Sequence, residues 1–145
     1  MEFITNSTGE TQDLAYKLGL ELKKRSIVAL NGDLGSGKTC FIQGIARGLN
    51  VPPQYPIVSP TFTFINEYPG RIPLFHVDLY RICEINDLEE NLEEIGFFEL
   101  FSKEGVVAIE WADRLPDGFI EDALFISIEI LDDYRRKIIM KQEKK

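Results

Sequence analysis

Apolar residues recur at helical spacing near the start of the chain, at Leu14, Ala15, Leu18 and Leu22. Ser7, with Glu10 three residues later, forms the capping-box pattern with which many helices begin. Together these patterns predict a helix over residues 8–24. The same spacing returns after Lys38, at Phe41, Ile42, Ile45, Ala46 and Leu49. It predicts a second helix, which ends near Asn50 and before two prolines.

The stretch between these helices has a different pattern. Ile27 to Leu30 is a short, continuous apolar run, which is typical of a strand covered on both faces. The sequence GDLGSGKT, Gly32 to Thr39, follows at once and leads into the second helix. The predicted order is therefore strand, glycine-rich loop, helix.

The rest of the chain is richer in strand patterns. TFTFINEY and PLFHVDLY are extended runs joined by Pro-Gly-Arg, which predicts a hairpin over residues 61–80. VVAIEW is another continuous apolar strand, and ALFISIEIL and RKIIMK read as strands around a turn at Asp132-Asp133. Between the hairpin and VVAIEW, a short acidic helix is predicted from about Asn86. Gly96 interrupts that helix, and FFELF predicts a further helical turn.

The glycine-rich stretch matches the phosphate-binding pattern G-x-x-x-x-G-K-T in full. Its glycines let successive backbone amides point at an anion, Lys38 reaches the β- and γ-phosphates, and Thr39 offers its hydroxyl to Mg²⁺. The alternative, a glycine-rich turn with an exposed lysine, leaves the flanking strand and helix unexplained. We therefore predict a nucleotide site with these loop contacts: Gly32, Asp33, Leu34, Gly35, Ser36, Gly37, Lys38, Thr39 and Cys40.

This loop and the order of the elements together predict the fold class. We expect an α/β fold, a three-layer sandwich like that of P-loop NTPases, with a mainly parallel central sheet and antiparallel hairpin additions. No linker divides residues 1–145, so we expect one domain.

Hydrolysis of a nucleotide needs carboxylates as well as the loop. Asp78 closes the run LFHVD and Glu110 closes VVAIE, so central strands would carry both to the carboxyl edge of the sheet, where ligands bind in open α/β folds. We expect Glu110 in the magnesium shell and Asp78 orienting the attacking water, although the sequence also permits the reverse. Lys38 completes the predicted catalytic set.

Three residues near these motifs each have two interpretations. Thr61, in SPTFTF, either senses the γ-phosphate from a mobile loop or merely begins a strand. His76 shares a strand face with Asp78, and a structural hydrogen bond is favoured for it over catalysis. Trp111, next to Glu110, is either a packing residue or an interface anchor.

Composition and charge indicate where the protein works and whether it binds nucleic acid directly. No apolar run approaches the ~18 residues of a membrane span, and the N-terminus lacks the basic start and apolar core of a signal peptide. We expect a cytoplasmic protein without membrane contact. Residues 1–134 carry 10 Lys+Arg and 23 Asp+Glu, whereas residues 135–145 carry six and one. The acidic body disfavours direct high-affinity nucleic-acid binding, and the basic tail is typical of a solvated last strand.

The chain contains two cysteines, Cys40 and Cys83, and a single histidine. This composition argues against a zinc site or a disulfide framework. Cys40 lies at a helix start, where the helix dipole favours the thiolate.

The motifs GDLGSGKT, SPTFTFINEY, HVDLYR and IEWADRLPD, in this order and spacing, resemble those of the bacterial TsaE proteins, also called YjeE. The resemblance implies a small ATPase that works with TsaD and TsaB proteins to form threonylcarbamoyladenosine beside the anticodon of tRNAs that read codons beginning with A. In that setting the partner proteins hold the tRNA, and this chain meets it only through the complex.

The resemblance also implies roles for particular residues. Thr39 and Glu110 occupy the positions of the family's Mg²⁺ ligands, and Asp78 is the aspartate of the HxDLYR motif. Adenine lies between the N-terminal segment and a late strand in this family. By position, its contacts here are Thr11 and Arg135 or Arg136.

Other functions fit the sequence less well. A small-molecule kinase usually holds its phosphate acceptor under an arginine-bearing lid, for which this sequence has no insertion. A GTP-dependent switch would carry the guanine-reading motif Asn-Lys-x-Asp, which this sequence lacks. An interaction module that binds no nucleotide would leave GDLGSGKT without a role.

Overall fold

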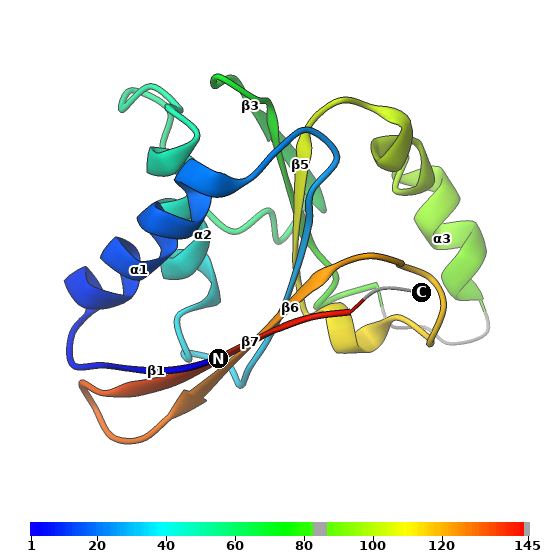
Figure 1. The fold of residues 1–145 in the computed structure, drawn as a ribbon. Coiled ribbons are helices and arrows are strands. Elements are labelled where there is room, and N and C mark those ends of the chain that lie inside the picture. Colours follow the sequence, from blue (N-terminus) through cyan, green and yellow to red (C-terminus); the bar gives the residue numbers. More distant parts are fainter. Residues whose placement is uncertain (83–86, 144–145) are drawn as a thin grey trace.

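A seven-stranded sheet runs through the molecule in the order β1-β7-β6-β2-β5-β4-β3 (Figure 1). The computed structural model describes residues 1–82 and 87–143. The strands are β1 (Glu2–Thr5), β2 (Ile27–Asn31), β3 (Ile65–Tyr68), β4 (Leu74–Asp78), β5 (Val106–Glu110), β6 (Leu124–Ile130) and β7 (Arg136–Gln142). The helices are α1 (Thr8–Glu21), α2 (Lys38–Gly48) and α3 (Leu88–Glu94), with 3₁₀ turns at Phe98–Ser102 and Ala112–Arg114.

Parallel pairing is confined to the centre of the sheet, where β6, β2, β5 and β4 lie side by side. β3 joins one edge antiparallel to β4, and β7 and β1 extend the other edge antiparallel to β6. The predicted α/β class and both predicted hairpins are therefore confirmed. The prediction of a mainly parallel sheet holds for the four central strands only, because half of the pairings among the described strands are antiparallel.

Helices cover both faces of the sheet. α1 and α2 lie on one side and α3 on the other (Figure 1). In β2, Val28 and Leu30 pack into the core under α1 and α2, whereas Ala29 packs into the core under α3. Because strand side chains alternate between faces, a strand buried on both sides has no polar positions. This burial explains the continuous apolar run at Ile27–Leu30.

The first helix begins as its sequence predicts and ends earlier. The Ser7 hydroxyl accepts the Glu10 N–H at 3.1 Å, which is the predicted N-cap. α1 ends at Glu21 and not at Lys24, because Leu22 turns to extended backbone. Apolar periodicity therefore located the helix but overran its C-terminal end.

Two strand predictions need correction. The first half of TFTFINEY is not a strand: residues 61–63 form a turn, Phe64 has a left-handed backbone (φ 65°), and β3 begins only at Ile65. The interpretation that Thr61 merely begins a strand is therefore wrong. β1 was not predicted, because its four residues gain their strand geometry from pairing with β7.

Some predictions fall outside the described residues: the start of the acidic helix near Asn86, the side chain of Cys83, and the last two residues of the basic tail. The described part of that helix is α3, and Gly96 follows it with a left-handed backbone (φ 80°). Within residues 1–82 and 87–143, none of the helices has the length and apolarity to cross a bilayer. The rest of the basic tail forms β7 up to Gln142.

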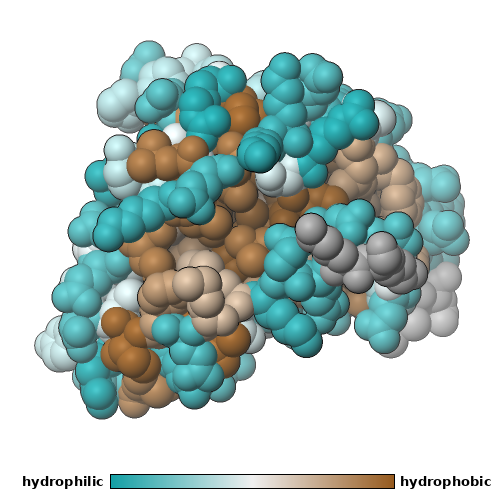
Figure 2. Space-filling view, viewed as in Figure 1, coloured by the Kyte–Doolittle hydropathy of each residue, from teal (hydrophilic) through white to brown (hydrophobic). Residues whose placement is uncertain are grey.

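Apolar side chains reach the surface around β1 and the turn between β6 and β7, while polar side chains cover the outer helices (Figure 2). The exposed large apolar or aromatic residues of these segments are Met1, Ile4, Ile130, Leu131 and Tyr134. This surface lies at the antiparallel edge of the sheet, where single exposed apolar residues are ordinary.

Candidate nucleotide-binding site

The glycine-rich loop connects β2 to α2, as predicted. Gly35 and Gly37 have φ values of 80° and 107°, in the left-handed region that favours glycine. Gly37 is also the N-cap residue of α2, and no side chain caps this helix start. The first amides of α2 are thus available to an anion at the positive end of the helix dipole.

Lys38 folds back over the loop. Its ammonium donates to the carbonyl oxygens of Gly32 at 2.6 Å and Asp33 at 3.0 Å, and it lies 4.0 Å from the centre of the Trp111 ring. Burial lowers the pKa of Lys38, and the nearby Glu110 carboxylate works in the opposite direction. The hydrogen-bond acceptors of this buried ammonium are thus neutral carbonyls, and an anionic ligand would be a stronger acceptor.

Asp78 and Glu110 end the neighbouring parallel strands β4 and β5 and lie opposite each other in register. Both are buried, with 5% and 3% of their surface exposed. The Thr39 hydroxyl donates to the Glu110 carboxylate at 3.0 Å. The structure thus brings the two predicted carboxylates to the predicted edge of the sheet, and Glu110 is the one in contact with Thr39.

The loop before β3 contacts Asp78. The Ser59 hydroxyl donates to Asp78 at 2.5 Å, and the Tyr80 N–H donates to the other carboxylate oxygen at 2.8 Å. Sequence reasoning missed Ser59, although its position before Pro60 in SPTFTF was the available signal. A cavity of about 430 Å³ lies over these groups. Its lining residues include Gly35, Lys38, Thr39, Ser59, Thr61, Asp78, Glu110 and Trp111.

A second cavity, of about 380 Å³, adjoins the first and shares Gly35, Gly37 and Cys40 with it. Its other lining residues are Ser7, Thr8, Thr11, Ser36, Asp133, Tyr134 and Arg136. Thr11 therefore lines a cavity next to the glycine-rich loop, and its hydroxyl is hydrogen-bonded to that of Thr5 at 2.7 Å.

Of the two arginines considered for the adenine contact, Arg136 lines this second cavity and Arg135 does not. Arg135 pairs with Asp132 at 2.7 Å, and this hydrogen bond holds the pKa of Asp132 at about 2. One further expectation was wrong. Burial raises the pKa of the Cys40 thiol, and this desolvation outweighs the opposing effects of the Gln12 hydrogen bond and the Arg136 charge.

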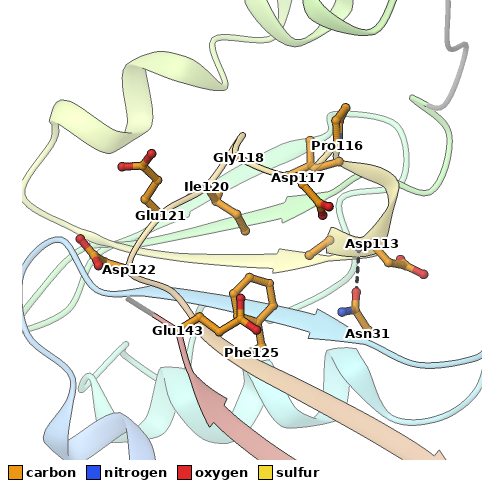
Figure 3. Close-up of a pocket in the computed structure, with 12 residues that line it drawn as sticks. Asn31, Asp113, Pro116, Asp117, Gly118, Ile120, Glu121, Asp122, Phe125 and Glu143 are labelled. Carbon is orange, nitrogen blue, oxygen red and sulfur yellow. Dashed lines mark hydrogen bonds between the residues drawn. The ribbon is translucent and has the colours of Figure 1, made fainter. Parts of the chain in front are cut away.

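A cavity of about 620 Å³, larger than these two, lies elsewhere (Figure 3). It lies beside the segment that follows β5, where the Asp113 N–H donates to the Asn31 side chain at 2.8 Å. Five acidic residues line it, and Figure 3 labels each of them: Asp113, Asp117, Glu121, Asp122 and Glu143. Such a lining repels phosphate, and none of the predicted site residues contributes to it. The volume of a cavity therefore does not identify the nucleotide site in this protein.

Thr39 and Glu110 are the residues of this site whose oxygens fit the usual ligands of Mg²⁺. Among residues 1–82 and 87–143, no group of three or more His, Cys, Asp or Glu could hold a metal ion. Mg²⁺ is usually bound by one or two protein oxygens, together with phosphates and waters. The adjacent oxygens of Thr39 and Glu110 meet that requirement.

A family model described as "Threonylcarbamoyl adenosine biosynthesis protein TsaE" matches residues 5–138. The chain belongs to the TsaE family. The resemblance inferred from the four motifs is thereby confirmed. Because the match includes the glycine-rich loop, both carboxylates and Arg136, the whole candidate site lies within the TsaE region.

Individual TsaE relatives agree with this. A protein of Treponema pallidum named "tRNA threonylcarbamoyladenosine biosynthesis protein TsaE" is 37% identical over 95% of this chain and 98% of its own length. A protein of the same name from a Nostoc species is 50% identical over 73% of this chain, a stretch that spans 64% of the Nostoc protein. The crystal structure of YdiB from Bacillus subtilis, 29% identical, superposes with a TM-score of 0.78 over 99% of this chain and 85% of YdiB.

Proposed function

We propose that this chain binds and hydrolyses ATP with Mg²⁺, in the formation of threonylcarbamoyladenosine beside the anticodon of tRNAs that read codons beginning with A. The observation that carries the proposal is one cavity in which Lys38 and Thr39, at the start of α2, face Asp78 and Glu110, at the ends of two parallel strands. The names of the TsaE relatives supply the pathway.

Phosphate binding would use the loop backbone and Lys38. The ammonium already has partners in the carbonyls of Gly32 and Asp33, but a phosphate oxygen carries charge and is a stronger acceptor. We expect Lys38 to exchange these carbonyls for the β- and γ-phosphates. The adjoining cavity, between Thr11 and Arg136, then takes the adenine.

Thr39 and Glu110 are the residues that would hold Mg²⁺, which supplies charge neutralisation for the transferred phosphoryl group. Asp78 then remains to orient the attacking water. The hydrogen bonds from Ser59 and from the Tyr80 N–H fix its carboxylate. Thr61, in the turn that lines the same cavity, would then sense the γ-phosphate. The direct contact between Thr39 and Glu110 favours this assignment over its reverse.

The proposed partners are TsaD- and TsaB-type proteins in the cytoplasm. Residues 1–134 are strongly acidic, so neutralisation of RNA phosphates must come from another chain. In this arrangement the partners hold the tRNA, and this domain, in a sandwich of the P-loop NTPase type, supplies the nucleotide-driven step.

The test compares Asp78→Asn and Glu110→Gln with Glu89→Gln, an exposed carboxylate of α3, as the matched control. Both site variants keep the loop amides and Lys38, so ATP should still bind by calorimetry. Hydrolysis should fall by about 10² or more, because a positioned acid–base or metal-binding group is lost. Both should also fail to support threonylcarbamoyladenosine formation with purified TsaD and TsaB proteins and tRNA.

The control should match the parent in all three measurements. Parent rates of hydrolysis and of tRNA modification in both site variants would contradict the proposed site. Loss of hydrolysis with normal tRNA modification would separate the ATPase activity from the pathway.

A further inference from the structure

His76 lies on β4, two residues before Asp78, and none of its surface is exposed. Its Nε2 is 2.5 Å from a carboxylate oxygen of Glu110. Its Nδ1 is buried and has no hydrogen-bond partner among the described residues. From this geometry we infer that His76 is a positioning residue, which fixes the carboxylate of Glu110 for metal binding. The inference rests on the proposed function and deepens it.

The direction of the hydrogen bond follows from the two ring nitrogens. A carboxylate only accepts hydrogen bonds, so the ring hydrogen belongs on Nε2 and is donated to Glu110. Nδ1 is then an acceptor that carries no hydrogen. In the opposite tautomer, Nδ1 would be a buried N–H donor without a partner, and Nε2 and the Glu110 oxygen would face each other as two acceptors. The unpartnered Nδ1 therefore assigns a single tautomer to His76.

A role in packing alone does not explain this residue. The other residues of β4 before Asp78 are Leu74, Phe75 and Val77, and the residue opposite His76 on β5 is the small Ala108. An apolar side chain would fill such a place without the desolvation that imidazole suffers. The hydrogen bond to Glu110 is what offsets that cost.

The Glu110 carboxylate thus accepts hydrogen bonds from two residues, from His76 Nε2 and from Thr39 Oγ1. Thr39 is itself a proposed metal ligand, so its contact with Glu110 must change when Mg²⁺ binds. The contact from His76 does not have to change. His76 is therefore the group that keeps the carboxylate oriented in both states.

Outer partners of metal ligands typically contribute a factor of about 10 to 100 in metal affinity. Removal of the His76 donor should accordingly weaken metal binding at least ten-fold. Nucleotide binding without metal should stay within about two-fold of the parent, because neither the loop amides nor Lys38 is hydrogen-bonded to His76.

The experiment uses three variants of His76. The terminal amide of His76→Gln can donate from near the Nε2 position, whereas His76→Leu has no donor. The amide of His76→Asn lies near the Nδ1 position and falls short of Glu110, so it provides a polar comparison if the leucine variant does not fold. Mn²⁺ serves as the probe, titrated into the nucleotide-bound full-length protein and followed by electron paramagnetic resonance. ATP affinity is measured by calorimetry with excess chelator.

We expect His76→Leu and His76→Asn to lose Mn²⁺ affinity at least ten-fold and His76→Gln to recover most of it. ATP affinity in chelator should remain near that of the parent in all three. Glu110→Ala separates the two proposals. If Glu110→Ala binds Mn²⁺ as the parent does, the metal role in the proposed function is wrong. If Glu110→Ala loses affinity but His76→Leu and His76→Asn do not, the positioning role of His76 is wrong and the proposed function stands.

Discussion

Arg136, in the last strand, donates its Nε–H to the backbone carbonyl of Ser36 in the phosphate loop at 2.9 Å. The two residues are 100 positions apart. The same guanidinium also donates to the carbonyl of Asp132 in the hairpin turn, at 2.8 Å. The β6–β7 hairpin therefore anchors the loop from the side of the second cavity, in addition to the anchoring that β2 and α2 provide.

This anchor predicts different effects for two neighbouring arginines. Arg136→Ala should weaken ATP binding roughly ten-fold, because a hydrogen bond from a charged donor, worth about 1.5–3 kcal/mol when buried, is lost from a half-buried position. Arg135→Ala should change the affinity little, since its side chain pairs with Asp132. Calorimetry with ATP measures both. A larger loss in Arg135→Ala would show that the adenine contact lies at Arg135, as the sequence also allowed.

Lys38→Ala should abolish most nucleotide affinity without loss of stability. Its ammonium is a buried cation whose pKa is lowered by desolvation, so the substitution removes a desolvation cost that offsets the loss of its hydrogen bonds and of its attraction to Glu110. We expect a thermal unfolding midpoint equal to or above that of the parent, and ATP binding too weak for calorimetry. Normal ATP affinity in this variant would contradict phosphate binding by the loop.

The same lysine gives the site a pH dependence. Because burial lowers the pKa of Lys38, the ammonium loses its proton at a lower pH than an ordinary lysine does. As the pH rises, ATP affinity should therefore begin to decline at a lower pH than it would if Lys38 had the pKa of an ordinary lysine. Lys38→Arg is the matched control, because arginine keeps its charge throughout this range, and its affinity profile should be flat there.

The sequence predicted those parts of the fold and site that depend on neighbours along the chain. The glycine loop, the burial of Ile27–Leu30 and the placement of Asp78 and Glu110 follow from local patterns and from the rule that parallel strands share a carboxyl edge. Helix limits were less certain, because α1 stops where Leu22 becomes extended and not where its apolar stripe ends.

Contacts between segments that are distant in the chain could not be predicted from the sequence. The alternation in TFTFINEY favours a strand. Phe62 is nevertheless 80% exposed and the first residues form a turn, because the chain passes the nucleotide site there before it joins the sheet. Ser59 and Arg136 meet Asp78 and the loop backbone only once the fold has formed. A backbone carbonyl is present in every residue, so a hydrogen bond to one cannot be predicted from residue types.

Cys40 lines both cavities, and its raised pKa predicts slow alkylation near neutral pH. In a Cys83→Ala background, iodoacetamide labelling followed by mass spectrometry should accelerate as the pH approaches and passes the ordinary thiol value of 9.0. ATP should slow the reaction at every pH, because the nucleotide covers the thiol. Labelling that is fast at pH 7 and indifferent to ATP would place the thiol outside the site.

Neither cysteine should be needed for hydrolysis. The Cys40 thiol contacts the carbonyl of Thr8 at 3.7 Å and the side chain of Gln12, and neither group is a base that would activate it. The Cys40→Ala, Cys83→Ala double variant should therefore hydrolyse ATP at a rate close to that of the parent. An inactive but folded double variant would overturn this expectation.

Trp111 should report the movement of Lys38. It is the only tryptophan of the sequence, it lines the cavity over the phosphate loop, and its ring centre lies 4.0 Å from the Lys38 ammonium. If the ammonium leaves the carbonyls of Gly32 and Asp33 for the phosphates, the charge beside the indole shifts and its fluorescence changes. We expect an emission change that saturates with the ATP affinity found by calorimetry, both with and without Mg²⁺.

Lys141→Ala, which removes an exposed lysine of β7, should keep this signal, and Lys38→Ala should lose it. Tight ATP binding with constant Trp111 emission would mean that Lys38 keeps its present partners, and that the phosphates are held by the loop amides alone.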